Sequence, residues 1–139
     1  KEYEQFMYKA TIISPGKLSS SGLLGAISEY EKRLKPFLKI EWILKDKQPT
    51  TPYICIDATG KVMNSMSFAH FILNQFEMRQ CRLTFVIGGA EGISKNILDN
   101  ASWIISLSKL TFTHQMARLI FIEQLYRTIE IQKGSKYNK

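Results

Sequence analysis

The most informative part of this 139-residue chain includes the stretch Phe85-Val86-Ile87-Gly88-Gly89-Ala90-Glu91-Gly92-Ile93-Ser94. Apolar residues that favour β-structure lead directly into three glycines within five residues. This pattern predicts a buried strand that opens into a loop whose backbone lies close to another group. A ligand is the expected group, although a Gly-Gly pair after a strand can also form a simple turn.

The spacing of these glycines excludes two common phosphate-binding loops. The order Gly88, Gly89, Gly92 does not fit G-x-G-x-x-G, and no Lys-Ser or Lys-Thr pair follows the last glycine. The loop therefore matches neither a dinucleotide fingerprint nor a Walker-type site.

Strands and helices alternate along the whole chain. The hydrophobic patterns predict strands over residues 7–13, 37–44, 53–57, 83–87 and 103–107, and helices over 23–34, 67–79, 94–100 and 114–132. This alternation predicts an α/β fold with a mostly parallel sheet and helices on both faces. The length predicts a single domain over residues 1–139.

Composition narrows the functional classes. A formal charge of +7 and a pI near 9.5 favour a polyanionic partner such as nucleic acid, with a solvated lysine-rich surface as the alternative. Cys55 and Cys81 lack metal-ligand spacing and read as reduced core thiols, so no metal is expected. No apolar run reaches the roughly 18 residues of a membrane span, and Lys1-Glu2-Tyr3-Glu4 does not resemble a signal peptide. We expect a cytoplasmic or organelle-matrix protein.

Three blocks of this sequence together resemble one protein family. They are Ile56-Asp57-Ala58-Thr59-Gly60-Lys61, the glycine loop Val86–Ser94, and Leu107–Arg127 with its ending Glu123-Gln124-Leu125-Tyr126-Arg127. The pattern is similar to the RlmH family of SPOUT-class methyltransferases, which use S-adenosylmethionine to methylate N3 of a pseudouridine in large-subunit ribosomal RNA. The resemblance implies a C-terminal trefoil knot, a homodimer, and the assembled ribosome as the partner.

The resemblance also implies which residues form the site. In an open α/β sheet the ligand binds beyond the carboxyl ends of the strands, and three such ends occur here, at Ile56, Gly88 and Leu107. Glu91 lies inside the glycine loop and could face the cofactor or be a surface carboxylate. The implied cofactor contacts are Ile56, Gly88, Gly89, Glu91, Leu107, Ser108, Lys109, Leu110, Thr111 and Phe112.

Methylation at N3 requires loss of an imino proton, which calls for a general base or for a cation that stabilises the anion. Tyr137 and His114 are the candidates for proton handling, and Arg118 and Lys139 for holding a phosphate or the anionic base. Alternatively, His114 only begins a helix that Thr113 caps, and Arg118 is a solvated helix charge. A basic tail of Lys133, Lys136 and Lys139 favours contact with RNA.

Two departures from the family pattern affect these expectations. RlmH-like chains usually carry an additional helix where this chain has only the polar connector 45–52. Family members commonly end in a segment like His-Pro-Tyr-His, whereas Asn138 follows Tyr137 here. The loss of this histidine keeps a non-catalytic, knotted RNA-binding or ribosome-assembly factor open as an alternative, beside a SPOUT enzyme that acts on transfer RNA.

Overall fold

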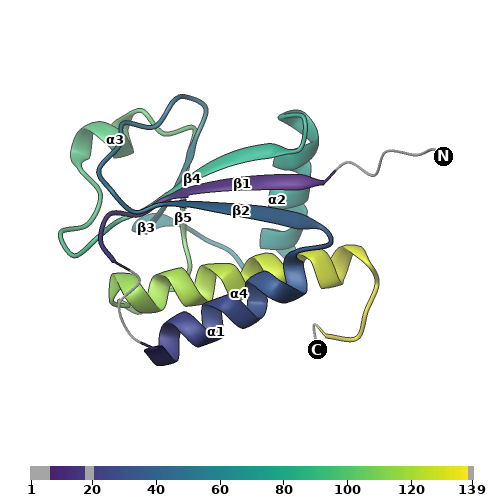
Figure 1. Ribbon diagram of the computed structural model, residues 1–139. Coiled ribbons are helices and arrows are strands. Elements are labelled where there is room, and N and C mark those ends of the chain that lie inside the picture. The colour runs from purple at the N-terminus through teal and green to yellow at the C-terminus, as the bar shows by residue number, and fades with distance from the viewer. Residues whose placement is uncertain (1–6, 18–20, 138–139) are drawn as a thin grey trace.

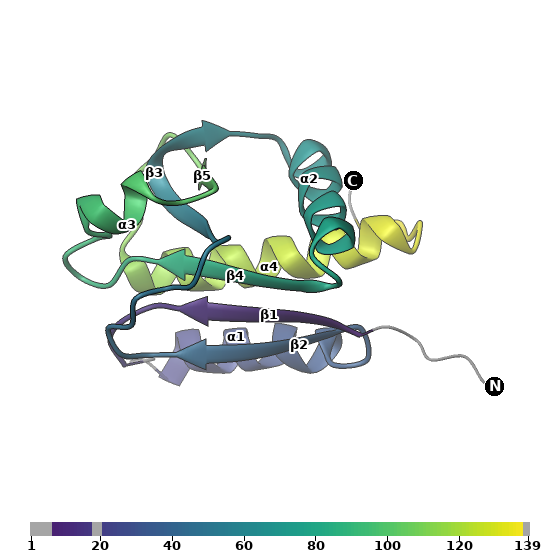
Figure 2. The ribbon, with the colours of Figure 1, turned by 90° about the horizontal axis from the view of Figure 1, so that it is seen from above.

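The computed structural model describes residues 7–17 and 21–137. Its elements follow the expected alternation, in the order β1 (Tyr8–Ile13), α1 (Ser21–Leu34), β2 (Leu38–Ile43), β3 (Ile54–Val62), α2 (Ser65–Met78), β4 (Arg82–Ile87), α3 (Lys95–Asp99), β5 (Trp103–Ser106) and α4 (His114–Gln132). The described strands form one sheet in the order β2-β1-β4-β3-β5, and neighbouring strands run parallel. Figure 2 shows β2, β1 and β4 side by side.

Helices cover the two faces of the sheet unequally. Figure 1 shows α1 and α4 lying side by side against one face, and α2 packs on α4 at the same face. The core between these layers contains Ile12, Phe85 and Phe121, all fully buried. Because side chains alternate along a strand, Ile13, Cys55 and Val86 point to the opposite face, where they meet Ile97 and Leu98 of α3. The expected α/β fold with helices on both faces is therefore confirmed.

Helix α4 is the central element of the thicker layer. It contacts α1 on one side and α2 on the other, and Phe121 and Ile122 are fully buried. Leu119 is partly buried against the same core. The continuous apolar run Leu119–Ile122 is thus largely covered by the core of the chain itself.

Strand β3 differs most from its predicted bounds. It continues to Val62 rather than ending at Asp57, and its register against β5 shifts between Ile56 and Lys61, which both pair with Ile105. Gly60 lies in this irregular segment, where a Cβ would come within 2.5 Å of the Ile104 carbonyl carbon. Glycine permits this close approach of two backbones. The trefoil knot itself remains an expectation from the family resemblance.

The two cysteines are free thiols. Cys55 is fully buried in β3, and burial raises the pKa of its thiol to about 12, so it stays protonated at neutral pH. This agrees with a core thiol. Cys81 is only half-buried and has a left-handed backbone with φ of 66° in the turn before β4.

Candidate active site

A cleft of about 770 Å³ lies where the carboxyl ends of β3, β4 and β5 meet the beginning of α4. Residues from all three strand ends line it, and Leu23 of α1 and His114 of α4 close it from the helix side. Most of the lining side chains are apolar, which suits a ligand with a flat aromatic or aliphatic part. The expected gathering of these three strand ends is therefore seen in the structure.

The glycine loop after β4 is packed too closely for larger residues. A Cβ on Gly88 would lie 2.7 Å from the Gly92 carbonyl carbon, and one on Gly89 would lie 2.6 Å from the Pro15 carbonyl oxygen. The loop closes on itself through a hydrogen bond of 3.0 Å from Gly92 N to Gly89 O. Glycine is therefore required here because the backbone folds against itself and against the loop after β1.

The segment after β5 is held by its own serines. Ser106 Oγ donates to the Ser108 carbonyl at 2.7 Å, and Ser108 Oγ accepts from Leu110 N at 3.0 Å. These local bonds fix the curve of the loop that forms one wall of the cleft. Leu110 itself is 71% exposed at the rim.

Eight of the ten proposed cofactor residues line this cleft: Ile56, Gly88, Gly89, Leu107, Ser108, Leu110, Thr111 and Phe112. Lys109 does not line it, and Glu91 lines a neighbouring hollow beside Asp46 and Ser94. Sequence reasoning missed Leu23, Asp57, Gln115 and Ala117 as lining residues. Asp57 carries a usable signal, since it directly follows a predicted strand, whereas the register of Leu23 and Ala117 depends on how α1 and α4 pack.

His114 is the half-buried first residue of α4 and lines the cleft. Burial, followed by the nearby Arg118 charge, lowers the pKa of its imidazole, so the ring is neutral at pH 7. The Thr113 side chain caps the helix by accepting from Met116 N at 3.2 Å. Thr113 caps the helix and His114 also lines the cleft, so a place at the start of a capped helix does not exclude a role for His114 at the site.

Arg118 is fully buried, and its guanidinium is saturated with hydrogen bonds. Nε donates to Ser14 Oγ, Nη1 to Lys17 O and Gln115 Oε1, and Nη2 to the carbonyls of residues 14–16. A guanidinium has five N–H groups, so none is left for a phosphate. This geometry corrects both earlier interpretations, because Arg118 is neither a solvated charge nor placed to grip an anion. It is a positioning residue for the loop after β1.

A chain of contacts links Arg118 to His114 through Gln115. Arginine can only donate, so the Gln115 carbonyl oxygen faces Arg118 at 3.3 Å, and the Gln115 Nε2 group lies 3.2 Å from His114 Nε2. The same Nε2 donates to Lys17 O at 2.8 Å. His114 Nε2 must then accept, which leaves the imidazole proton on Nδ1. The network assigns His114 the role of a neutral ring with an N–H donor.

Tyr137 does not line the cleft. Its hydroxyl donates to Glu123 Oε2 at 3.0 Å, and its ring packs edge-on against Tyr126 with centroids 4.8 Å apart. Burial, followed by the nearby Tyr30 hydroxyl and Glu123 carboxylate, raises the pKa of the Tyr137 phenol. Tyr137 is thus a protonated donor at neutral pH. Lys139 and Asn138 lie outside the described residues, and Lys133 of the tail pairs with Glu130 at 3.2 Å.

Comparison with known proteins identifies this arrangement. A family model described as "Predicted SPOUT methyltransferase" matches residues 39–138. A protein of Protochlamydia amoebophila named Ribosomal RNA large subunit methyltransferase H is 46% identical over 141 residues, covering 96% of this chain and 100% of the relative. A protein of the same name from Coprothermobacter proteolyticus is 40% identical over 138 residues, covering 94% and 99%. The chain belongs to the RlmH family of SPOUT methyltransferases.

Solved structures support the fold of this RlmH-family chain. A probable methylase family protein from Haemophilus influenzae Rd KW20 aligns with a TM-score of 0.60 at 10% identity, covering 97% of this chain and 72% of that one. A probable methyltransferase from Bordetella pertussis Tohama I aligns with a TM-score of 0.57 at 11% identity, covering 89% and 97%. At such low identity, these similarities concern the fold alone.

The described part of this RlmH-family chain offers neither a metal cluster nor a membrane-spanning helix. Within residues 7–17 and 21–137, no three His, Cys, Asp or Glu side chains are grouped closely enough to hold a metal ion. None of the helices in that part of the chain is both long and apolar enough to cross a membrane.

Proposed function

We propose that this protein uses S-adenosylmethionine to methylate N3 of a pseudouridine in large-subunit ribosomal RNA, in the cytoplasm and on the assembled ribosome. The observation that carries the proposal is the cleft, in which eight residues implied by the RlmH pattern come together from three strand ends. The names of the two relatives, which cover nearly the whole chain, support ribosomal RNA as the substrate class. The formal charge of +7 favours a polyanionic partner.

The cleft fits S-adenosylmethionine in size and lining. Its volume of about 770 Å³ exceeds what an adenosine derivative needs, and the apolar side chains of Ile56, Leu107 and Leu110 offer a slot for a purine ring. The tight glycine loop and the serine-braced loop after β5 present backbone groups at fixed positions. S-Adenosylmethionine supplies an activated methyl group, and the protein mainly has to align it with the nucleophile.

We expect hydrogen-bond donors, rather than a basic side chain of the protein, to promote loss of the N3 proton. His114 carries its proton on Nδ1. Tyr137 stays protonated because its pKa is raised, and its hydroxyl, which donates to Glu123 here, has to turn from that carboxylate toward the base in the completed site. Donors aimed at the carbonyl oxygens of the base stabilise its anion, which promotes loss of the N3 proton to solvent. Arg118 acts through Gln115 and the loop after β1 and does not touch the reacting atoms.

A second subunit completes this site. Tyr137 bonds to Glu123, nine residues beyond His114 on α4, and therefore cannot reach the cleft of its own chain in this arrangement. Exposed apolar residues adjoin the cleft: Leu110 lines its rim, while Leu24 and Met116 follow the lining residues Leu23 and Gln115. Such a rim suits an interface that buries the cleft edge and brings the partner's tail to it.

The test is single-turnover methylation of intact ribosomes with labelled S-adenosylmethionine, followed by mass spectrometry of the ribosomal RNA. We expect one labelled pseudouridine in the large-subunit RNA and none in transfer RNA. Label in transfer RNA alone would favour the other SPOUT activity. Calorimetry with S-adenosylmethionine is run in parallel, because a protein that binds neither the cofactor nor a methyl-accepting RNA cannot be this enzyme.

A second candidate function rests on the sequence at Asn138, where the family commonly has a histidine. If that histidine is essential for turnover, this chain binds ribosomes without methylating them. Ribosome binding together with cofactor binding but no methyl transfer would favour this non-catalytic factor.

A further inference from the structure

The central strands of the sheet carry polar side chains on the face opposite α1, α2 and α4. Lys9 pairs in register with Arg82, and Thr11 pairs with Thr84, across β1 and β4. Central strands of a parallel sheet are normally apolar on both faces, because helices cover both sides. The next pair in this row, Ile13 and Val86, follows that rule and is buried under α3. The polar half of the row therefore needs a separate explanation.

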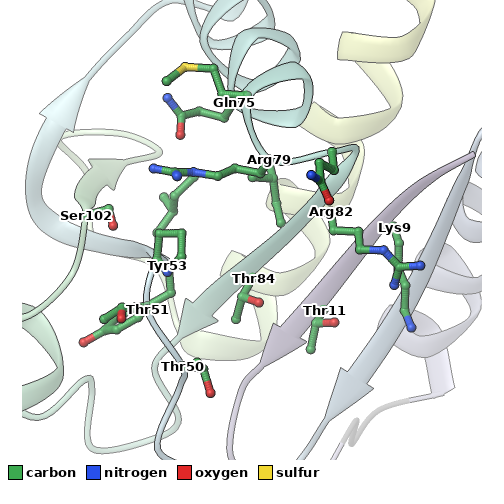
Figure 3. A pocket seen from close by; sticks show the side chains of 15 residues that line it. Lys9, Thr11, Thr50, Thr51, Tyr53, Gln75, Arg79, Arg82, Thr84 and Ser102 are labelled. Atoms are coloured by element: carbon green, nitrogen blue, oxygen red, sulfur yellow. The ribbon is translucent and has the colours of Figure 1, made fainter. Parts of the chain in front are cut away.

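A cavity of about 450 Å³ lies over these four residues. The pairing of β3 with β4 begins only at Ile54 and Phe85, so the first half of β4 has no strand on that side. The connector through residues 50–53, the end of α2 and Ser102 form the walls (Figure 3). The cavity shares no lining residue with the cofactor cleft, which opens at the other end of the strands.

The cavity is lined by cations without a lining carboxylate. Lys9, Arg79 and Arg82 contribute the positive charges. Lys9 Nζ lies 3.9 Å from Glu41 Oε1 at the exposed rim, a weak pair in water. Neither Arg79 nor Arg82 forms an ion pair within residues 7–17 and 21–137. Arg79 extends toward Ser102 at one end of the cavity, and Arg82 and Lys9 lie at the other end (Figure 3). These charges lack a lining carboxylate, which favours an anionic ligand.

Gln75 is an independent sign of a ligand. Its side chain lines the cavity although the residue is only 5% exposed, and its amide has no hydrogen-bond partner among the described residues. Figure 3 shows Gln75 of α2 and Arg79, the residue that follows this helix, extending on the side of Ser102. The amide opens into the cavity and no described side chain bonds to it, so it offers a donor and an acceptor to a polar group of a ligand. The hydroxyls of Thr11 and Thr84 offer further donors on the floor.

We propose that this cavity binds a phosphorylated ligand of nucleotide size, with its phosphates against Lys9 and Arg82 and a polar base or sugar atom against Gln75 and Arg79. The volume is too large for one phosphate and suits a nucleotide unit. The phosphates come either from a segment of RNA or from a free nucleotide. The inference goes beyond the methyl transfer proposed above, because the cavity is separate from the cofactor cleft.

The test titrates the full chain, labelled with ¹⁵N, with inorganic phosphate, with ADP and with a short single-stranded oligoribonucleotide. We expect amide shifts centred on Thr11, Gln75 and Thr84. Shifts with the oligoribonucleotide but not with ADP identify RNA as the source, and the reverse identifies a free nucleotide. No shift at these residues with any probe overturns the proposal.

A matched pair of double variants tests the charges. Arg79→Gln with Arg82→Gln removes two exposed cations from the cavity, and we expect the dissociation constant of the bound probe to rise about tenfold or more. Lys32→Gln with Lys35→Gln removes the same charge from the exposed end of α1, on the far face, and should change it less than about twofold. Equal weakening in both would show non-specific attraction and overturn the site. The affinity of the same variants for S-adenosylmethionine tests the proposed methyltransferase function independently of this cavity.

Discussion

The Tyr137 hydroxyl donates to Glu123 Oε2 at 3.0 Å, and the same carboxylate oxygen accepts from Arg127 Nη2 at 2.7 Å. Glu123 lies nine residues beyond His114 on α4, which corresponds to two and a half turns, or about 14 Å along the axis. His114 and Glu123 therefore face opposite sides of the helix, and Tyr137 lies on the side of Glu123. A site that uses both His114 and Tyr137 must draw them from different subunits.

Mixing two inactive variants tests this arrangement. We expect His114→Ala and Tyr137→Phe to lower single-turnover methylation strongly as separate homodimers, because each lacks one donor to the base. After subunit exchange, half of the dimers are mixed, and one of their two sites is intact, so about a quarter of the wild-type activity should return. Mixtures that stay inactive, although exchange is verified by mass spectrometry, would place both residues in one subunit's site.

The glycine loop provides a second prediction. Gly88→Ala places a methyl group 2.7 Å from the Gly92 backbone, so the loop must open and the wall of the cleft shifts. We expect at least tenfold weaker binding of S-adenosylmethionine by calorimetry, with an unchanged far-UV circular dichroism spectrum.

The matched control for that variant is Gly25→Ala. Gly25 is exposed in α1, and its added Cβ meets no atom within 4 Å. This substitution should stabilise the protein by up to about 1 kcal/mol, since alanine favours helix over glycine, and should leave cofactor binding alone. Equal affinity in both variants would remove Gly88 from the cofactor wall.

We expect the loss of the Arg118 side chain to lower the stability of the folded protein. Arg118→Met removes the guanidinium donors from the Ser14 hydroxyl and carbonyl, which are buried, and from the half-buried Pro15 carbonyl, and each unsatisfied buried group costs about 1–3 kcal/mol. We expect a loss of roughly 3 kcal/mol or more in the free energy of unfolding, measured with urea. Arg33→Met, which removes an exposed arginine paired with Glu29, should cost less than about 1 kcal/mol. A small, similar loss in both would contradict the positioning role.

The sequence predicts the order and type of every element, and the α4 bounds, because apolar segments are separated by turn residues and helix caps such as Thr113. It also predicts most of the residues that line the proposed cofactor cleft, since strand ends followed by Gly88 or Ser108 are local features. The role of Arg118 could not be predicted, because its acceptors lie about a hundred positions away in the chain. The same holds for the cavity over β1 and β4: Lys9 and Arg82 read as ordinary strand-edge charges until the strand order makes them neighbours.

The Arg118–Gln115–His114 contacts give a prediction about pH. The pKa of His114 is lowered in the folded protein, so the unfolded chain binds more protons just below pH 6.5. Stability should therefore fall as the pH drops from about 6.5 through the folded pKa. In Gln115→Glu, a carboxylate replaces the amide between Arg118 and His114 and accepts from both. It should raise the His114 pKa, so that the imidazolium persists to higher pH.

The measurement is the titration of the His114 ring by NMR, with His70 as the second, internal signal. Alongside it, urea unfolding is followed between about pH 5 and 8. In the wild type we expect unfolding free energy to increase with pH across the lower part of this range. In Gln115→Glu the His114 contribution should reverse sign, because a raised pKa stabilises the fold at low pH and is lost as pH rises. Gln124→Glu, one glutamine further along α4 and outside the cleft, is the control. An unchanged His114 titration in Gln115→Glu would show that Gln115 does not set the state of the imidazole, and the donor role of His114 would lose its basis.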